Sequence, residues 1–294
     1  TNLTGVTSAT VTLTAGAAAK LVFTAQPSNA AAGATITPPV TVTVQDALGN
    51  TVTGATSAVT VALANNPGGA TLGGTKTVNA VAGVATFAGL SVNMAGNGYT
   101  LGAASAGLTG ATSNAFNIAT GAAAAIAVNG GHGQSATAGS AVATPPSVKV
   151  TDGSGNGVAG VSVTFTVTGG GGSVSGASQS TNAQGIATVG SWTLGTTAGT
   201  NTLSAASAGL AGSPVVFTAT GTTGSAGQLA ILVQPSATAQ SGVPLAQQPQ
   251  LQLQDVNGNP VNTAGQSVTA SVASGPSGST LSNALSGGDV DIQS

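Results

Sequence analysis

The side chains with the most potential for chemistry are five aspartates, because the chain has no Glu and no Cys. Asp46, Asp152 and Asp255 each open the same segment, Asp-x-x-Gly-Asn, and Asp289 and Asp291 form a close pair. Calcium takes six to eight oxygen ligands, so one carboxylate per segment suffices only where neighbouring loops add carbonyls. These five residues are the calcium candidates of the chain.

A turn without a ligand explains the same residue types. An Asp carboxylate accepts backbone N–H groups of its own turn, while Gly and Asn adopt positive φ. We therefore predict that the three segments are hairpin turns and that the chain has no cofactor and no metal, with calcium as the alternative.

Catalysis is not expected. Acid–base and hydrolytic chemistry needs paired titratable groups held close together, and the single histidine, His132, stands in the segment Asn129-Gly-Gly-His-Gly, which is typical of a solvated loop. The run Gly169–Gly172 is followed by neither Lys-Ser/Thr nor a helix, so it predicts a flexible hairpin connection rather than a phosphate loop. We predict that the chain is not an enzyme.

Two aromatic residues have both a structural and a binding interpretation. Trp192 could stack on a sugar, but it aligns with Leu90 of an earlier repeat, which favours core packing. Tyr99 opens a late strand and could form a tyrosine corner. Asn201 replaces it in the next repeat, which weakens that idea.

Charge excludes two classes of partner. The only cations besides the histidine are Lys20, Lys76 and Lys149, far apart in the sequence, and the net charge is −2. Nucleic acids and anionic membranes attract clustered cations, and no apolar run is long enough to span a bilayer. We expect neither nucleic-acid binding nor membrane insertion. Low net charge removes the repulsion that keeps proteins apart, so it favours association.

The elements around the aspartates repeat. Each Asp segment follows an alternating stretch such as Val40–Val44, and the copies recur at roughly hundred-residue intervals. Hydrophobic residues make up 41% of the chain but aromatics only 2%, which suits thin sandwiches of β-branched residues. We predict an all-β fold: tandem immunoglobulin-like β-sandwich domains in a linear array. The predicted repeats are 17–120, 121–224 and an incomplete 225–294, and residues 1–16 form the terminal strand of a preceding or neighbouring domain.

The second repeat carries a family resemblance. Its segments Val148-Lys-Val-Thr-Asp-Gly-Ser-Gly-Asn156, Gly160-Val-Ser-Val-Thr-Phe165 and Asn182-Ala-Gln-Gly-Ile-Ala-Thr188 are similar to bacterial immunoglobulin-like repeats of the invasin/intimin type (Big domains). The resemblance implies a large secreted or cell-surface protein with a stalk, adhesin or matrix role, without selecting one, because function is not fixed by the fold.

The chain termini suggest a mode of assembly. Leu3–Leu13 aligns without gaps on Leu108–Ile118, so Val11 and Leu13 are expected to act as the inward residues of a closing strand. In one hypothesis this strand completes the third repeat of another copy, head to tail. In the other, the sequence is a window from a longer polypeptide.

These observations give a functional prediction: a non-catalytic structural subunit of an extracellular bacterial filament, stalk or surface layer. The alternatives are an adhesin or carbohydrate-binding surface module and a phage or virion fibre protein. The expected partners are copies of itself or neighbouring domains of the same polypeptide, with surface glycans as a further candidate, and the expected location is extracellular or on the cell surface.

Overall fold

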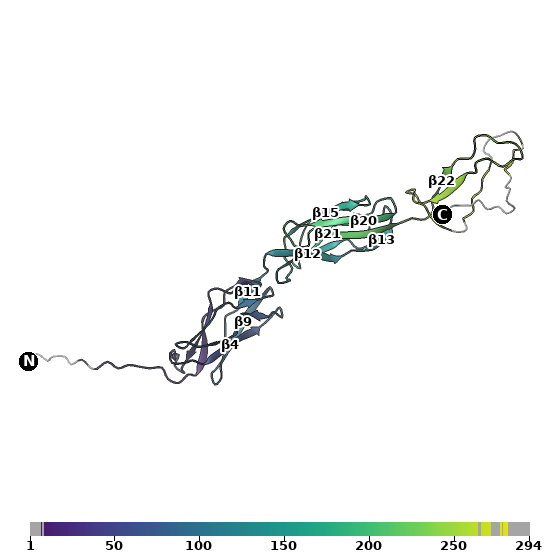
Figure 1. The fold of residues 1–294 in the computed structure, drawn as a ribbon. Coiled ribbons are helices and arrows are strands. Elements are labelled where there is room, and N and C mark those ends of the chain that lie inside the picture. Colours follow the sequence, from purple (N-terminus) through teal and green to yellow (C-terminus); the bar gives the residue numbers. More distant parts are fainter. Residues whose placement is uncertain (1–6, 8, 264–265, 272–276, 278, 282–294) are drawn as a thin grey trace, which may run out of the picture. The chain divides into compact units, whose positions relative to one another are not determined.

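The computed structural model of the chain describes residues 7, 9–263, 266–271, 277 and 279–281. No helix occurs among these residues (Figure 1), and they therefore contain no helix that could span a membrane. The described residues form two compact units. The first contains 1–125, 150–161 and 181–185, and the second contains 126–149, 162–180 and 186–294.

The first repeat is a sandwich of two sheets. One sheet has the order β1–β3–β7 and the other β2–β11–β9–β4–β6, with β10 paired to β9 and a small pair β5–β8 beside them. The strands are β1 (Lys20–Ala25), β2 (Ala30–Ala31), β3 (Val40–Gln45), β4 (Ala58–Asn65), β5 (Leu72–Gly73), β6 (Thr77–Asn79), β7 (Val84–Phe87), β8 (Ser91–Val92), β9 (Gly96–Ala104), β10 (Ala111–Thr112) and β11 (Phe116–Ala119).

The second repeat has the same strand order, β12–β14–β18 in one sheet and β13–β21–β20–β15–β17 in the other, with a small pair β16–β19. Its strands are β12 (Ala123–Gly130), β13 (Gln134–Thr137), β14 (Ser147–Asp152), β15 (Ser162–Gly169), β16 (Ser173–Ser175), β17 (Ser178–Ser180), β18 (Ile186–Thr188), β19 (Ser191–Thr193), β20 (Gly199–Ala206) and β21 (Val215–Thr222). The predicted fold class, tandem immunoglobulin-like sandwiches, is confirmed.

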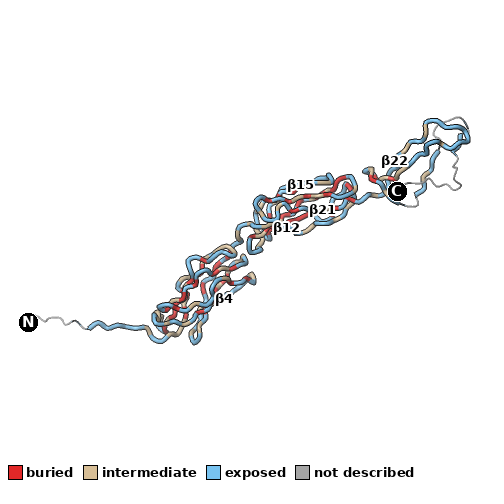
Figure 2. Tube along the Cα trace, viewed as in Figure 1, coloured by how far each residue is buried: buried red, intermediate tan, exposed pale blue. Residues whose placement is uncertain are grey.

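Alternation along the strands builds both cores. In β3 the apolar residues Val40, Val42 and Val44 are fully buried, and Phe116 and Ile118 of β11 are buried across the sandwich from them. All five Phe, the Tyr and the Trp are buried. Figure 2 shows the buried residues inside each sandwich. A few aromatic rings among many Val, Leu and Ala residues therefore fill two thin cores.

The third repeat contains one antiparallel pair of strands in its described part, β22 (Gln228–Val233) and β23 (Gln250–Gln254). By alignment this pair corresponds to β1 and β3. Leu229 and Ile231 align with Leu21 and Phe23, which are buried in the first sandwich, yet they are 50% and 53% exposed. The inward face of this sheet is therefore half uncovered.

The predicted closing strand lies partly outside the described residues. Residues 9–15 form no strand, and Val11 and Leu13 are 84% and 92% exposed. Asp289 and Asp291 lie outside the described residues.

Candidate functional site

The three Asp turns share one pattern of hydrogen bonds. At the first, Oδ1 of Asp46 accepts the backbone N–H groups of Leu48 (3.0 Å) and Asn50 (2.8 Å). Its Oδ2 accepts the Asn50 side-chain amide (3.0 Å) and the backbone N–H of Gly16 (2.9 Å), which lies on the chain leading into the repeat. Four N–H groups thus surround one carboxylate.

The other two turns repeat this pattern. Asp152 accepts N–H groups of Ser154, Asn156 and Gly121 at 2.8–2.9 Å, together with the Asn156 amide. Asp255 does the same with Asn257, Asn259, Gly224 and the Asn259 amide. The prediction that each Asp satisfies its own turn is confirmed. Each Asp also accepts the N–H of a Gly at the boundary between repeats, Gly16, Gly121 or Gly224, and the sequence pattern does not predict this contact.

Two details of the turns were predicted wrongly. Positive φ occurs at the Gly of each turn, 94° at Gly49, 89° at Gly155 and 85° at Gly258, but at none of the three turn Asn residues. The turns are also not hairpins between paired strands. In the first repeat, the two sides of the turn are paired by one isolated bridge, between Gln45 and Thr51. The next strand, β4, joins the other sheet. The Asn is therefore used for its side-chain amide rather than for its backbone.

These hydrogen bonds shift the titration of the aspartates. The Asn50 side-chain amide, followed by the backbone N–H groups of Asn50 and Gly16, lowers the pKa of Asp46 to about 2. The Asn259 amide and the Gly224 N–H likewise lower the pKa of Asp255 to about 2. At Asp152 burial raises the pKa, but the N–H groups outweigh it and the pKa is lowered.

We expect acid to destabilise the repeats through these groups. Because the pKa is lower in the folded chain than the usual value of about 3.9, the stabilisation is complete above about pH 4 and is lost as the pH falls towards about 2. We expect the urea concentration at the unfolding midpoint, measured from about pH 6 to about pH 2, to decrease between about pH 4 and about pH 2. D46N, which cannot ionise, is the control and should remove part of the dependence. A midpoint that is equal at both ends of the window would contradict the assignment.

The Asn of two turns also reaches the loop of the preceding repeat. In the first compact unit, Asn156 Oδ1 accepts the N–H of Ala95 (3.1 Å), and its Nδ2 donates to the carbonyl of Asn93 (3.0 Å). In the second compact unit, Asn259 Oδ1 accepts the N–H of Ala198 (2.7 Å), and its Nδ2 donates to the carbonyl of Thr196 (2.9 Å). We call each such turn, with the loop it binds, a joint.

A second contact accompanies each joint. A Cβ placed on Gly33 would lie 3.0 Å from Ser154 Oγ, and one placed on Gly139 would lie 3.4 Å from Asn257 Nδ2. The third residue of the turn therefore lies against a glycine with φ of +76° or +81°, where a side chain would crowd it. Asn257 also donates to the carbonyl of Ala138 (3.1 Å).

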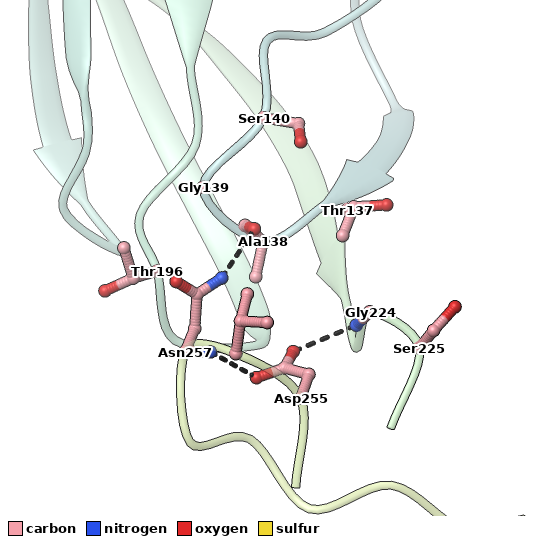
Figure 3. Close-up of a pocket in the computed structure, with 10 residues that line it drawn as sticks. Thr137, Ala138, Gly139, Ser140, Thr196, Gly224, Ser225, Asp255 and Asn257 are labelled. Atoms are coloured by element: carbon pink, nitrogen blue, oxygen red, sulfur yellow. Dashed lines mark hydrogen bonds between the residues drawn. The ribbon is translucent and has the colours of Figure 1, made fainter. Parts of the chain in front are cut away.

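An open pocket of about 480 Å³ lies beside the second joint and is lined by residues 137–140, 196, 224–225 and 255–257 (Figure 3). Asp255 is the one titratable side chain in this lining, and its oxygens face the N–H groups of Gly224 and Asn257. The pocket therefore offers no pair of groups for acid–base catalysis.

Removing one turn carboxylate should be costly. D152A would strip the N–H groups of Gly121, Ser154 and Asn156 of their acceptor, and we expect a loss of about 2 kcal/mol in the free energy of unfolding. S154A, which removes a hydroxyl from the same turn, is the matched control and should change little. Urea denaturation followed by circular dichroism measures both, and equal losses in the two variants would contradict this role of the carboxylate.

The calcium candidates gain no support from this geometry. The carboxylate oxygens of Asp46, Asp152 and Asp255 face N–H groups, and the positive ends of these groups would repel a cation. In addition, no cluster of three or more His, Asp, Glu or Cys that could hold a metal occurs among the described residues. The absence of a cofactor and of catalysis stay predictions.

The remaining candidates lie elsewhere. Trp192 is fully buried, which confirms core packing, and His132 is an exposed loop residue with its ring 6.2 Å from that of Phe217. Gly169–Gly172 connects β15 to β16, which pairs with β19 in another sheet. The prediction of a hairpin there was therefore wrong, because the chain crosses between sheets.

Tyr99 does form the hydrogen bond of a tyrosine corner. Its hydroxyl donates to the carbonyl of Met94 (3.0 Å), and burial raises its pKa. Asn201, which replaces it in the second sandwich, is also fully buried. Its Oδ1 accepts the N–H of Gly195 (2.9 Å), and its Nδ2 donates to the carbonyl of Gly199 (3.2 Å). Two different side chains thus bind the equivalent loop, each in its own sandwich.

No protein-family model matches the sequence, and no curated protein matches it. Among solved structures, the chain is similar to FdeC, described as a broadly conserved Escherichia coli adhesin (22% identity, TM-score 0.43, covering 85% of this chain and 78% of that one). It is also similar to the D0–D1 domains of intimin (24%, 0.26, 69% and 95%) and to invasin, described as a bacterial integrin-binding protein (19%, 0.39, 82% and 47%). Intimin and invasin, whose repeats the sequence motifs resemble, are thus among the structures to which it is similar. The fold assignment rests on the strand order of the chain's own sandwiches.

Proposed function

We propose that the chain is a non-catalytic structural part of an extracellular bacterial filament, stalk or surface layer, in which Asp–Asn turns fasten each repeat to the one before it. The observation that carries the proposal is the repetition of one joint. Asn156 and Asn259 make the same pair of hydrogen bonds to loop groups two residues apart.

The chemistry of the joint suits a mechanical role. Each joint uses a neutral amide and backbone groups, and its ionised Asp is stabilised by N–H donors rather than by a cation, so neither contact depends on ion pairing. Salt screens exposed ion pairs, whereas such hydrogen bonds keep their strength over a wide range of ionic strength. A protein outside the cell meets such variation.

A carbohydrate-binding module is the alternative that fits less well. Sugar platforms need exposed aromatic rings, and all five Phe, the Tyr and the Trp are buried. No observation on the described residues favours a phage or virion fibre over a bacterial surface protein.

Strand complementation is the finer form of the proposal. In the first sandwich, Thr109 pairs with the edge of β1, where its carbonyl accepts the N–H of Leu21 and its N–H donates to Ala19 (2.9 Å each). The segment then continues to Phe116 and Ile118 in the opposite sheet. The segment 108–118 thus pairs with the edge of one sheet and also contributes buried side chains to the core.

The third repeat offers matching positions. β22 pairs only with β23 among the described strands, and Leu229 and Ile231 are half exposed. Because residues 3–13 align on 108–118, we propose that this segment of a second copy binds there, with Val11 and Leu13 in the places of Phe116 and Ile118.

The joints can be tested by hydrogen exchange. N156A should speed exchange of the Ala95 amide, and N259A that of the Ala198 amide, by about 2- to 10-fold each, because a hydrogen bond contributes about 0.5–1.5 kcal/mol. N50A is the matched control, because Asn50 makes the bond within its turn (3.0 Å) but binds no loop among the described residues. If N156A and N259A leave these two amides as slow as N50A does, the joints do not fasten the repeats.

A further inference from the structure

The Asp46 turn has the internal hydrogen bonds of the two joints but, among the described residues, no partner loop. Its carboxylate accepts the N–H of Gly16 at 2.9 Å, as Asp152 accepts Gly121 and Asp255 accepts Gly224. Its Asn50 amide makes the same bond inside the turn, at 3.0 Å. The local geometry needed to bind a loop is therefore already formed.

The equivalent side chains of this turn, Leu48 and Asn50, meet no loop among the described residues. Asn259 is buried and Asn156 is partly buried, whereas Asn50 is exposed and, among the described residues, bonds only to Asp46. Leu48 occupies the position of Ser154 and Asn257, which lie against Gly33 and Gly139, and it is 89% exposed. The position that meets a glycine in both other turns is therefore uncovered in the Asp46 turn.

We propose that the Asp46 turn is a third docking face of the same kind. Its partner is another sandwich of this repeat type, one whose last strand runs into Gly16. Three contacts define the complex: Asn50 binds the N–H and C=O of a loop like 93–95, Leu48 packs on a glycine like Gly33, and the Gly16 N–H stays on Asp46.

The choice of partner follows from this chain. Both turns that are occupied hold a sandwich loop of the same repeat type, and residues 3–13 align without gaps on 108–118, the segment that leads from the first sandwich to the Asp152 turn. Leu48 adds an apolar contact where Ser154 and Asn257 are polar. The docking face therefore selects a sandwich with a glycine at the position of Gly33, because a side chain there would meet the leucine.

This inference rests on the joints of the proposed function and can be tested apart from them. The probe is the chain with residues 1–15 replaced by a second copy of residues 17–120, so that Thr120 of the added copy precedes Gly16 as Thr120 precedes Gly121 in the chain itself. The buried core of the first sandwich comes from residues 21–118 alone, so the added copy contains a complete core.

The measurement is hydrogen exchange of the Ala95 amide in the added copy, with only that copy isotope-labelled. We expect this amide to be slow and N50A to speed its exchange by about 2- to 10-fold, while the core amides stay unchanged and show that the variant is folded. L48D should speed the same amide, because it places a carboxylate against the loop.

The outcomes separate the two proposals. Equal exchange with and without N50A and L48D overturns the docking face, and the proposed function survives if N156A still speeds the chain's own Ala95 amide. Failure of N156A to change that amide overturns the joints themselves.

Discussion

Trp192→Ala should destabilise the second sandwich by about 3–5 kcal/mol, the cost of emptying a fully buried aromatic site. Trp192 lies on β19, which pairs with β16, and its carbonyl accepts the N–H of Val142 (2.9 Å). Truncation would leave a cavity between these strands that a core poor in other aromatics cannot refill. Urea unfolding followed by circular dichroism measures the loss.

Trp192→Leu is the matched control. Leu90 holds the aligned position in the first sandwich, so leucine is compatible with this architecture. The buried indole N–H of Trp192 finds no hydrogen-bond partner in the described part of the chain, and leucine removes that unsatisfied group. We expect a clearly smaller loss than for alanine and no change in the exchange of first-sandwich amides. A loss below about 1 kcal/mol for the alanine variant would show that this ring does not build the core.

Deleting residues 1–16 should abolish the proposed head-to-tail assembly, because residues 3–13 align with 108–118 and the described residues 9–15 form no strand. A milder change isolates the cause. V11D together with L13D would bring two charges into the apolar site beside Leu229 and Ile231, and we expect the same loss of assembly. Sedimentation velocity and electron microscopy of the purified protein measure it.

T10D together with T12D is the matched control, because these residues alternate with Val11 and Leu13 and would face outward in a strand. Filaments should persist in this variant. Filaments that also persist in V11D/L13D would rule out strand complementation. The competing hypothesis of a longer polypeptide predicts an intact native mass far above the 27.1 kDa of this sequence.

The fold was predictable because its signals are local. Alternation in Val40–Val44 and the repeated Asp turns are read within a few residues, and period and turn chemistry suffice to identify a strand and its end. Trp192 was predictable for a related reason: two copies of one fold place aligned residues in the same environment, so Leu90 indicated its burial.

The joints were not predictable because their contacts are non-local. Asn156 binds Asn93 and Ala95 across about sixty residues, and no pattern within either segment encodes that meeting. One signal existed. The Asn is present in all three turns although its backbone does not need positive φ, which points to its side chain. The Gly169–Gly172 connection was misjudged similarly, because sequence alone does not show which sheet the next strand joins.

Residual dipolar couplings test most directly whether Asn156 and Asn259 fasten consecutive repeats. In the wild-type first compact unit, couplings from β9 and β11 and from residues 152–158 should fit one alignment frame. N156A should reduce the turn's couplings relative to those of the strands, and N50A should leave both sets in the same frame. If N156A keeps the two sets in one frame as well as N50A does, the joint is not what holds them, and the account is contradicted.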